Sequence, residues 1–261
     1  MVVARDGQGT CTRSSGTGSH DMSDIDLTEV AARHNGSRTL QGYLVRPPGE
    51  GPWPGVVMVH EAFGLEDVMR RQADRLASAG FLTLAPDLFS AGGARRCLVS
   101  TMRAMLSGKG RAYGDIEAAR QWLSASAECT GKIGVIGFCM GGGFALMVAD
   151  SGFDAAAPNY GTLPRDLDAA MGGACPVVAS YGGKDFSLKK AAAKLDVALT
   201  KAGVVHDVRE YPTAGHGFLN DEVAGPKVIR PLLKVAGMVP DPDAATDAWA
   251  RIDAFFREHL G

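Results

Sequence analysis

Cys139 lies at the centre of a short motif that could carry nucleophilic chemistry. Residues 137–141 read G-x-C-x-G, which is the pattern of a nucleophile elbow with cysteine in place of the usual serine. Because the flanking glycines have no Cβ, a strand can turn tightly into a helix there and hold the central side chain out over the edge of a sheet. The free N–H groups and the dipole of that helix favour a thiolate. The motif therefore indicates a cysteine nucleophile.

Two other interpretations fit a glycine-rich segment between a strand and a helix. A dinucleotide-binding loop would read G-x-G-x-x-G, and no window of residues 134–143 has that spacing. A lone cysteine in such a turn is usually a buried structural residue. A structural role for Cys139 becomes less probable only if other reactive side chains accompany it.

An acid and a base do follow Cys139, in the order expected of an acyl-transfer triad. Asp185 comes after a predicted strand, and His216 lies in the sequence Ala-Gly-His-Gly-Phe. His216 can take the thiol proton, while Asp185 can hold the imidazole in the right tautomer and stabilise its cation. Asp87 is a rival acid, but it precedes the cysteine and breaks this order. The simpler alternatives are a surface loop histidine and a turn-forming aspartate.

The elements that must position these residues can be read from the hydrophobic pattern. Apolar runs predict strands over residues 55–59, 81–85, 133–138, 153–160, 176–181 and 204–211, and helical patterns cover 67–78, 113–125, 144–148, 189–201 and 244–259. Residues 27–45 are predicted to form a β-hairpin around Asn35-Gly36. Residues 90–110 are expected to be irregular, and residues 220–242 to be a loop or short insertion.

This alternation predicts an α/β fold with layers of helices around a mainly parallel sheet and a leading antiparallel hairpin. Functional groups in such sheets collect beyond the carboxyl ends of the strands. Glu61, Cys139, Asp185 and His216 each come shortly after a predicted strand. We therefore expect these four side chains to meet at one edge of the sheet.

The composition limits the classes of function and location. The chain has 261 residues, 46% of them hydrophobic, which suits one α/β domain over residues 23–261 after a disordered tail over residues 1–22. The net charge of -2 gives no reason to expect a nucleic acid or an anionic membrane as a partner. Five scattered cysteines predict neither disulfides nor a zinc site. With no membrane-span run and no secretory signal, the cytoplasm is the expected location.

Several short segments together resemble the dienelactone hydrolase (carboxymethylenebutenolidase) family. They are Gly-Phe-Cys-Met-Gly-Gly around Cys139, His-Glu-Ala-Phe-Gly-Leu at 60–65, Ala-Pro-Asp-Leu at 85–88, Gly-Lys-Asp at 183–185 and Gly-His-Gly-Phe at 215–218. The resemblance runs from about residue 26 to the last predicted helix. It implies an α/β-hydrolase fold, a small-molecule lactone or ester substrate, and no metal or cofactor.

The resemblance also implies a role for each matching residue. Cys139 corresponds to the nucleophile, His216 to the base and Asp185 to its orienting acid. Glu61 corresponds to a carboxylate that contacts the resting thiol and helps to generate the thiolate. The remaining expected site residues are the oxyanion-hole donors, which are the N–H groups of Ala62 and Met140, and the substrate contacts Phe63, Arg95, Arg96, Tyr160 and Phe218.

The chain departs from the family at the residues that bind the substrate carboxylate. The best-known members use two arginines, and Arg95 or Arg96 could serve as the first. The second would follow the catalytic histidine, where residues 219–221 read Leu-Asn-Asp. Lys227 or Arg230 could supply a substitute cation. We therefore expect hydrolysis of a lactone or small ester by a monomer or homodimer. A general carboxylesterase or thioesterase, or a binding or redox-responsive protein without activity, remains the alternative.

Overall fold

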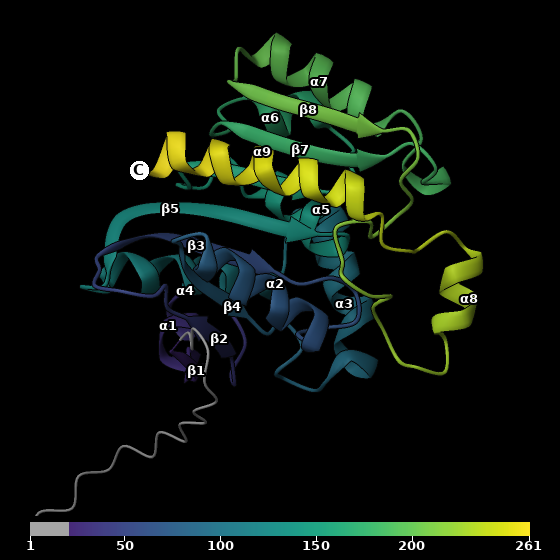
Figure 1. Ribbon diagram of the computed structural model, residues 1–261. Coiled ribbons are helices and arrows are strands. Elements are labelled where there is room, and N and C mark those ends of the chain that lie inside the picture. Colours follow the sequence, from purple (N-terminus) through teal and green to yellow (C-terminus); the bar gives the residue numbers. More distant parts are fainter. Residues whose placement is uncertain (1–20) are drawn as a thin grey trace, which may run out of the picture.

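A computed structural model describes residues 21–261 (Figure 1). Within these residues, eight strands form one sheet in the order β1-β2-β4-β3-β5-β6-β7-β8. The strands are β1 (Met22–Asp26), β2 (Gln41–Val45), β3 (Trp53–Val59), β4 (Leu82–Pro86), β5 (Cys129–Phe138), β6 (Ala155–Asn159), β7 (Val177–Gly182) and β8 (His206–Tyr211). β2 runs antiparallel to β1 and to β4, and the other neighbours are parallel. The predicted mainly parallel sheet with an antiparallel start is confirmed.

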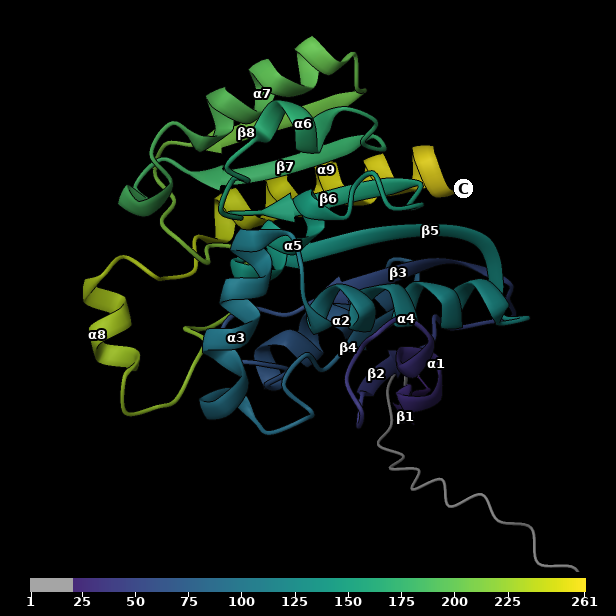
Figure 2. The ribbon, with the colours of Figure 1, turned by 180° about the vertical axis from the view of Figure 1, so that it is seen from behind.

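Helices cover both faces of the sheet (Figures 1 and 2). They are α1 (Thr28–Arg33), α2 (Asp67–Ser78), α3 (Ala94–Ser107), α4 (Arg111–Ala125), α5 (Met140–Met147), α6 (Leu167–Met171), α7 (Ala191–Ala202), α8 (Arg230–Val235) and α9 (Pro242–Leu260). Buried residues of α2 and α9 pack on one face, and those of α4, α5 and α7 pack on the other. Within the described residues, no helix combines the length and the apolar composition that a membrane span requires.

Strand β3 shows why the sheet is buried on both faces. Val57 and Val59 belong to the core beneath α4 and α5, while Val56 and Met58 belong to the core beneath α2 and α9. All four side chains are fully buried. Because successive side chains point to opposite faces, a strand between two helical layers must be apolar at every position. This pattern makes the central strands recognisable in the sequence.

The predicted hairpin over residues 27–45 is wrong in its first half. β1 ends at Asp26, and residues 28–33 form the short helix α1. The Asp26 carboxylate accepts a hydrogen bond from the Thr28 N–H at 2.8 Å, which starts the turn. Asn35 takes a positive φ of 56°, and the Gly36 N–H donates to the Ala31 carbonyl at 2.8 Å. The Asn-Gly pair therefore ends a helix rather than turning a hairpin.

Two segments expected to be irregular contain helices. α3 occupies most of residues 90–110, and its buried positions Cys97, Thr101, Ala104 and Met105 recur at helical spacing. The short helix α8 lies within residues 220–242, beyond the carboxyl ends of the strands (Figure 1). The expected tail over residues 1–22 lies outside the described residues up to residue 20, and Met22 already pairs with Val45.

Candidate active site

Cys139 sits on a sharp turn between β5 and α5. Its φ is 53°, a value that non-glycine residues rarely adopt. A Cβ on Gly137 would lie 1.9 Å from the Gly141 carbonyl oxygen, and one on Gly141 would lie 2.1 Å from the Val59 carbonyl oxygen. Only glycine fits at these two positions, because the neighbouring atoms are backbone. The turn places the partly exposed thiol at the N-terminus of α5.

His216 and Asp185 form a hydrogen-bonded pair beside this cysteine. His216 Nδ1 lies 2.5 Å from Asp185 Oδ2, and the imidazole lies close enough to Cys139 for that side chain to raise its pKa. The Ser187 N–H and hydroxyl donate to Asp185 Oδ1 at 3.0 and 2.6 Å, which fixes the carboxylate. The arrangement places a base between a nucleophile and an orienting acid.

The electrostatics of this group favour a protonated imidazole. Burial lowers the pKa of His216, but the hydrogen bonds with Asp185 and Cys139 and the charges of both residues raise it to about 10. Burial raises the pKa of Asp185, but hydrogen bonds from His216 and Ser187 outweigh burial and hold it below the ordinary value. The pair therefore carries an imidazolium beside a carboxylate near neutral pH.

Glu61 is a buried carboxyl group in the same cluster. Asn220 Nδ2 lies 3.4 Å from Glu61 Oε1 and 3.5 Å from Oε2. Burial raises the pKa of Glu61 to about 7, with the charge of Glu66 adding to the rise and Asn220 and His216 opposing it. Glu61 can therefore change its protonation state near neutral pH.

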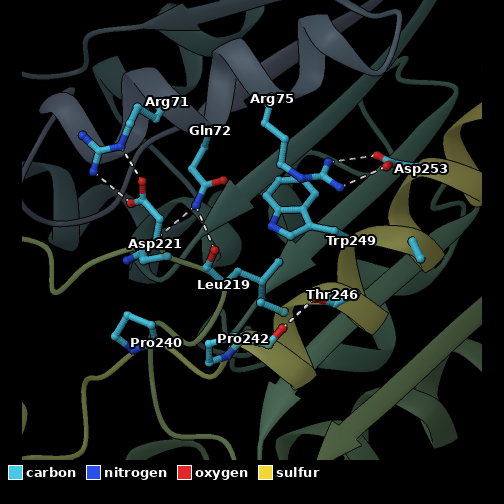
Figure 3. A pocket seen from close by; sticks show the side chains of 13 residues that line it. Arg71, Gln72, Arg75, Leu219, Asp221, Pro240, Pro242, Thr246, Trp249 and Asp253 are labelled. Atoms are coloured by element: carbon cyan, nitrogen blue, oxygen red, sulfur yellow. Dashed lines mark hydrogen bonds and ion pairs between the residues drawn. The ribbon is translucent and has the colours of Figure 1, made fainter.

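Asn220 is itself held by helix α2. Gln72 Nε2 donates to the Leu219 carbonyl at 2.9 Å and reaches Asn220 Oδ1 at 3.5 Å. Figure 3 shows Gln72 extending from α2 to Leu219. Sequence reasoning missed Gln72, since no spacing rule connects a helix after β3 with a loop after β8.

The loop after β3 is fixed by His60, a second residue without a predicted role. The Leu88 N–H donates to His60 Nε2 at 3.1 Å, so Nδ1 carries the hydrogen and donates to the Glu61 carbonyl at 2.8 Å. Asp87, the rival acid, lies 3.7 Å from His60 Nε2, whereas Asp185 is paired with His216. His60 thereby ties the backbone of Glu61 to the end of β4.

The two expected oxyanion donors flank the nucleophile. Met140 is the first residue of α5, directly after Cys139, and Ala62 lies in the loop after β3, the strand beside β5. The Ala62 N–H makes no hydrogen bond within residues 21–261. Both N–H groups therefore belong to segments that follow neighbouring strands of the sheet.

The expected aromatic substrate contacts differ in exposure. The Tyr160 and His216 ring centroids lie 5.1 Å apart, and those of Tyr160 and Phe218 lie 5.7 Å apart. Tyr160 and Phe218 are buried, so Phe218 supports the site from within the core. Phe63 is partly exposed and packs against Gly225, the residue at the start of the segment that carries α8.

The charged residues expected to bind a carboxylate differ in their exposure and in their ion pairs. Arg95 and Arg96 are exposed at the start of α3, and neither makes an ion pair within the described part of the chain. Arg230 pairs with Glu222 at 2.8 Å. Asp221 pairs with Arg71 at 2.5 Å, so its charge is countered by α2 (Figure 3). Lys227 is exposed.

A cavity of about 740 Å³ lies between α2 and α9, apart from Cys139 (Figure 3). Its wall includes Trp249, with the Arg75 guanidinium 3.9 Å from the ring centroid, and Asn220 borders it on the side of Glu61. Over residues 21–261, no group of three or more His, Cys, Asp or Glu side chains is arranged to hold a metal ion.

The sequence and the fold of this chain are similar to those of known proteins. The model of the family described as "Dienelactone hydrolase family" matches residues 40–260. A Pseudomonas putida carboxymethylenebutenolidase is 29% identical over 195 residues, which cover 70% of this chain and 83% of that protein. The crystal structure of a dienelactone hydrolase-like promiscuous phosphotriesterase from metagenomic libraries is 26% identical, with a TM-score of 0.79, and the match covers 94% of this chain and all of that one. A dienelactone hydrolase structure from Anabaena variabilis has the same fold at 20% identity, with a TM-score of 0.67 and 93% and 99% of the two chains covered.

Proposed function

The chain belongs to the dienelactone hydrolase family, and from this premise we propose that it hydrolyses a lactone or small carboxylic ester through an acyl-enzyme on Cys139. The observation that supports the proposal is the hydrogen bond between His216 and Asp185 beside Cys139 at the carboxyl edge of the sheet. Such an arrangement stabilises a thiolate and supplies a proton to a leaving group.

In the first step, Cys139 Sγ attacks the carbonyl carbon of the substrate. The imidazole of His216 already carries its proton beside Asp185, so the thiol proton passes to the Glu61 carboxylate and a thiolate is formed. The carbonyl oxygen becomes an oxyanion and accepts hydrogen bonds from the N–H groups of Ala62 and Met140. Each such donor contributes about 10²- to 10³-fold in rate at comparable sites.

The tetrahedral intermediate then collapses. The bond between the carbonyl carbon and the leaving oxygen breaks, the electron pair stays on that oxygen, and His216 supplies the proton. Water next attacks the thioester on Cys139 while His216 takes a proton from it, and the acid product leaves with the thiol restored. Asp185 holds the imidazole in the required orientation through both steps.

Glu61 has a separate part in this proposal. A charged carboxylate beside a thiolate would be repelled by it, whereas a protonated one would not. Because the pKa of Glu61 is about 7, the carboxylate can accept the proton of the resting thiol near neutral pH. The thiolate is then left beside a neutral acid, which lowers the cost of holding the nucleophile in its reactive form.

A general carboxylesterase or thioesterase is the second candidate. It is favoured by the position of the charged residues, because Arg95 and Arg96 are exposed and Asp221 is already paired with Arg71. A substrate without a carboxylate needs no cation in the site. A panel of dienelactone, p-nitrophenyl acetate and acyl thioesters separates the two candidates by their kcat/KM values.

The decisive experiment compares the wild type with Cys139→Ala on dienelactone and p-nitrophenyl acetate. Loss of both activities in a folded variant would support the acyl-enzyme on Cys139. Cys175→Ala is a matched control, because Cys175 is also a partly buried cysteine but its pKa is raised by burial to about 12. Full activity in Cys139→Ala would overturn the proposal. A wild type inactive on the whole panel, with Cys139 oxidised by low peroxide, would favour a redox-responsive protein.

A further inference from the structure

The hydroxyl of Tyr160 is buried without a hydrogen-bond partner in residues 21–261. The side chain is 1% exposed, and the residue follows the end of β6. Its φ is 39°, and its N–H donates to the Ser180 carbonyl at 2.7 Å, which holds the backbone in this conformation. A buried unpaired hydroxyl and a positive φ at a tyrosine are both unfavourable. Together they point to a function for this side chain.

The Tyr160 side chain packs beside residues of the proposed active site. The Tyr160 ring lies against His216, with 5.1 Å between the ring centroids. Burial raises the pKa of the phenol well above the ordinary value, and the charges of Glu61 and Cys139 add to this rise. The phenol therefore keeps its hydrogen and can donate a hydrogen bond to an electron-rich atom. In this structure it hydrogen-bonds with neither Cys139 nor Glu61.

Tyr181 provides an internal comparison. It is also 1% exposed, and its hydroxyl is also unpaired. Its pKa, however, is raised by burial alone, and its side chain belongs to the core on the opposite face of the sheet. An unpaired hydroxyl surrounded only by core residues has no atom to act on. Tyr160 differs because its ring packs against His216 and the charges of Glu61 and Cys139 act on its phenol.

The order of the strands defines which part of a substrate this donor faces. β5, which precedes Cys139, lies between β3 and β6. The oxyanion donor Ala62 follows β3, on one side of the thiol. Tyr160 follows β6 and His216 follows β8, on the other side. A carbonyl oxygen directed toward Ala62 therefore leaves the bond to be broken on the side of Tyr160 and His216.

We propose that Tyr160 is a catalytic residue whose hydroxyl donates a hydrogen bond to the leaving oxygen of the substrate. This inference rests on the proposed acyl-enzyme mechanism. As the carbon–oxygen bond breaks, the electron pair moves onto the leaving oxygen. Tyr160 stabilises the growing negative charge and keeps its own hydrogen, while the proton that completes the alcohol or enol product comes from His216.

Tyr160→Phe tests this role, because it removes the oxygen and keeps the ring beside His216. The value of kcat/KM reports acylation, so it is compared for p-nitrophenyl acetate and phenyl acetate, whose leaving oxygens differ in basicity. We expect a loss of about 10- to 100-fold with phenyl acetate and a clearly smaller loss with p-nitrophenyl acetate. The more basic oxygen gains more from a hydrogen bond as its charge develops.

The controls separate this role from a structural one and from the mechanism itself. Tyr181→Phe should leave the ratio of the two kcat/KM values unchanged. Tyr160→Phe should unfold at the same or a higher temperature than the wild type, because the lost hydroxyl had no partner. An equal loss on both esters, or no loss, would overturn the role of Tyr160. Activity that survives in Cys139→Ala would instead overturn the underlying mechanism.

Discussion

The side-chain amide of Asn220 lies 3.4 Å from Oε1 of Glu61, so the buried carboxyl group has a neutral hydrogen-bond donor as its partner. A neutral donor lowers the pKa of a carboxyl group less than a cation would. Burial is therefore the larger effect, and the pKa of Glu61 is raised to about 7. The site thus contains an acid that titrates within the physiological range.

The first prediction concerns stability against pH. Between about pH 4.5 and 7 the unfolded chain has lost the Glu61 proton and the folded chain has kept it, so the free energy of unfolding falls as the pH rises. Above pH 7 the full loss is about 3 kcal/mol. In Glu61→Gln this loss is absent. The free energy of unfolding measured in urea should therefore rise for the variant, relative to the wild type, from pH 5 to 8.

Glu117 offers a control with the opposite sign. Burial raises the pKa of Glu117, but hydrogen bonds from Arg120 and Gln121 hold it below the ordinary value. Its contribution to stability is complete above about pH 4.5 and is lost as the pH falls below that value, so Glu117→Gln should lose stability relative to the wild type only as the pH rises toward 4.5, and the difference should stay constant from pH 5 to 8. A difference between Glu61→Gln and the wild type that does not change with pH would refute a raised pKa at Glu61.

A second prediction concerns Asn220. Its hydrogen bond lowers the pKa of Glu61, so Asn220→Ala should raise that pKa further above 7. The pH at which ionisation of Glu61 lowers the free energy of unfolding should then rise by on the order of one pH unit. It is measured as the difference in unfolding free energy between Asn220→Ala and Asn220→Ala/Glu61→Gln across the pH range. An unchanged midpoint would show that the amide does not act on the carboxyl group.

A third prediction concerns the orienting acid. Asp185→Asn should lower kcat/KM by about 10³- to 10⁴-fold, because the imidazole loses both its orientation and the charge that stabilises its cation. The pKa of His216 should fall from about 10, so the loss of activity at high pH should begin at a lower pH than in the wild type. Ser187→Ala removes one of the hydrogen bonds to Asp185 and should cost about tenfold or less. Equal effects of the two substitutions would argue against this role for Asp185.

The sheet and the order of the candidate triad could be predicted, because both leave local patterns in the sequence. A strand such as β3 is a continuous apolar run, and Cys139 lies within a short motif. The helix α1 was not predictable in the same way, since Asn-Gly signals a hairpin turn as readily as a helix end. The partly polar α3 was missed because apolar residues such as Val99 and Leu106 are exposed, so its apolar residues do not mark the buried face.

The contacts that hold Asn220 beside Glu61 could not be predicted at all. Gln72 and Leu219 are 147 residues apart, and only the packed structure brings α2 against the loop after β8. The ion pair between Asp221 and Arg71 depends on the same long-range packing. Such contacts carry no signal in the spacing of one sequence.

The last prediction concerns the glycines of the elbow. Gly141→Ala would place a Cβ 2.1 Å from the Val59 carbonyl oxygen, so β3 or the start of α5 must move. We expect unfolding in urea to show a loss of about 3 kcal/mol or more. Because Val59 leads directly to Glu61 and Ala62, the same movement should lower kcat/KM. Gly172→Ala is the matched control, since its Cβ would meet no atom closer than 3.5 Å and should change stability by less than about 1 kcal/mol. Wild-type stability and activity in Gly141→Ala would show that the elbow tolerates a side chain, and the steric account of the G-x-C-x-G motif would then be wrong.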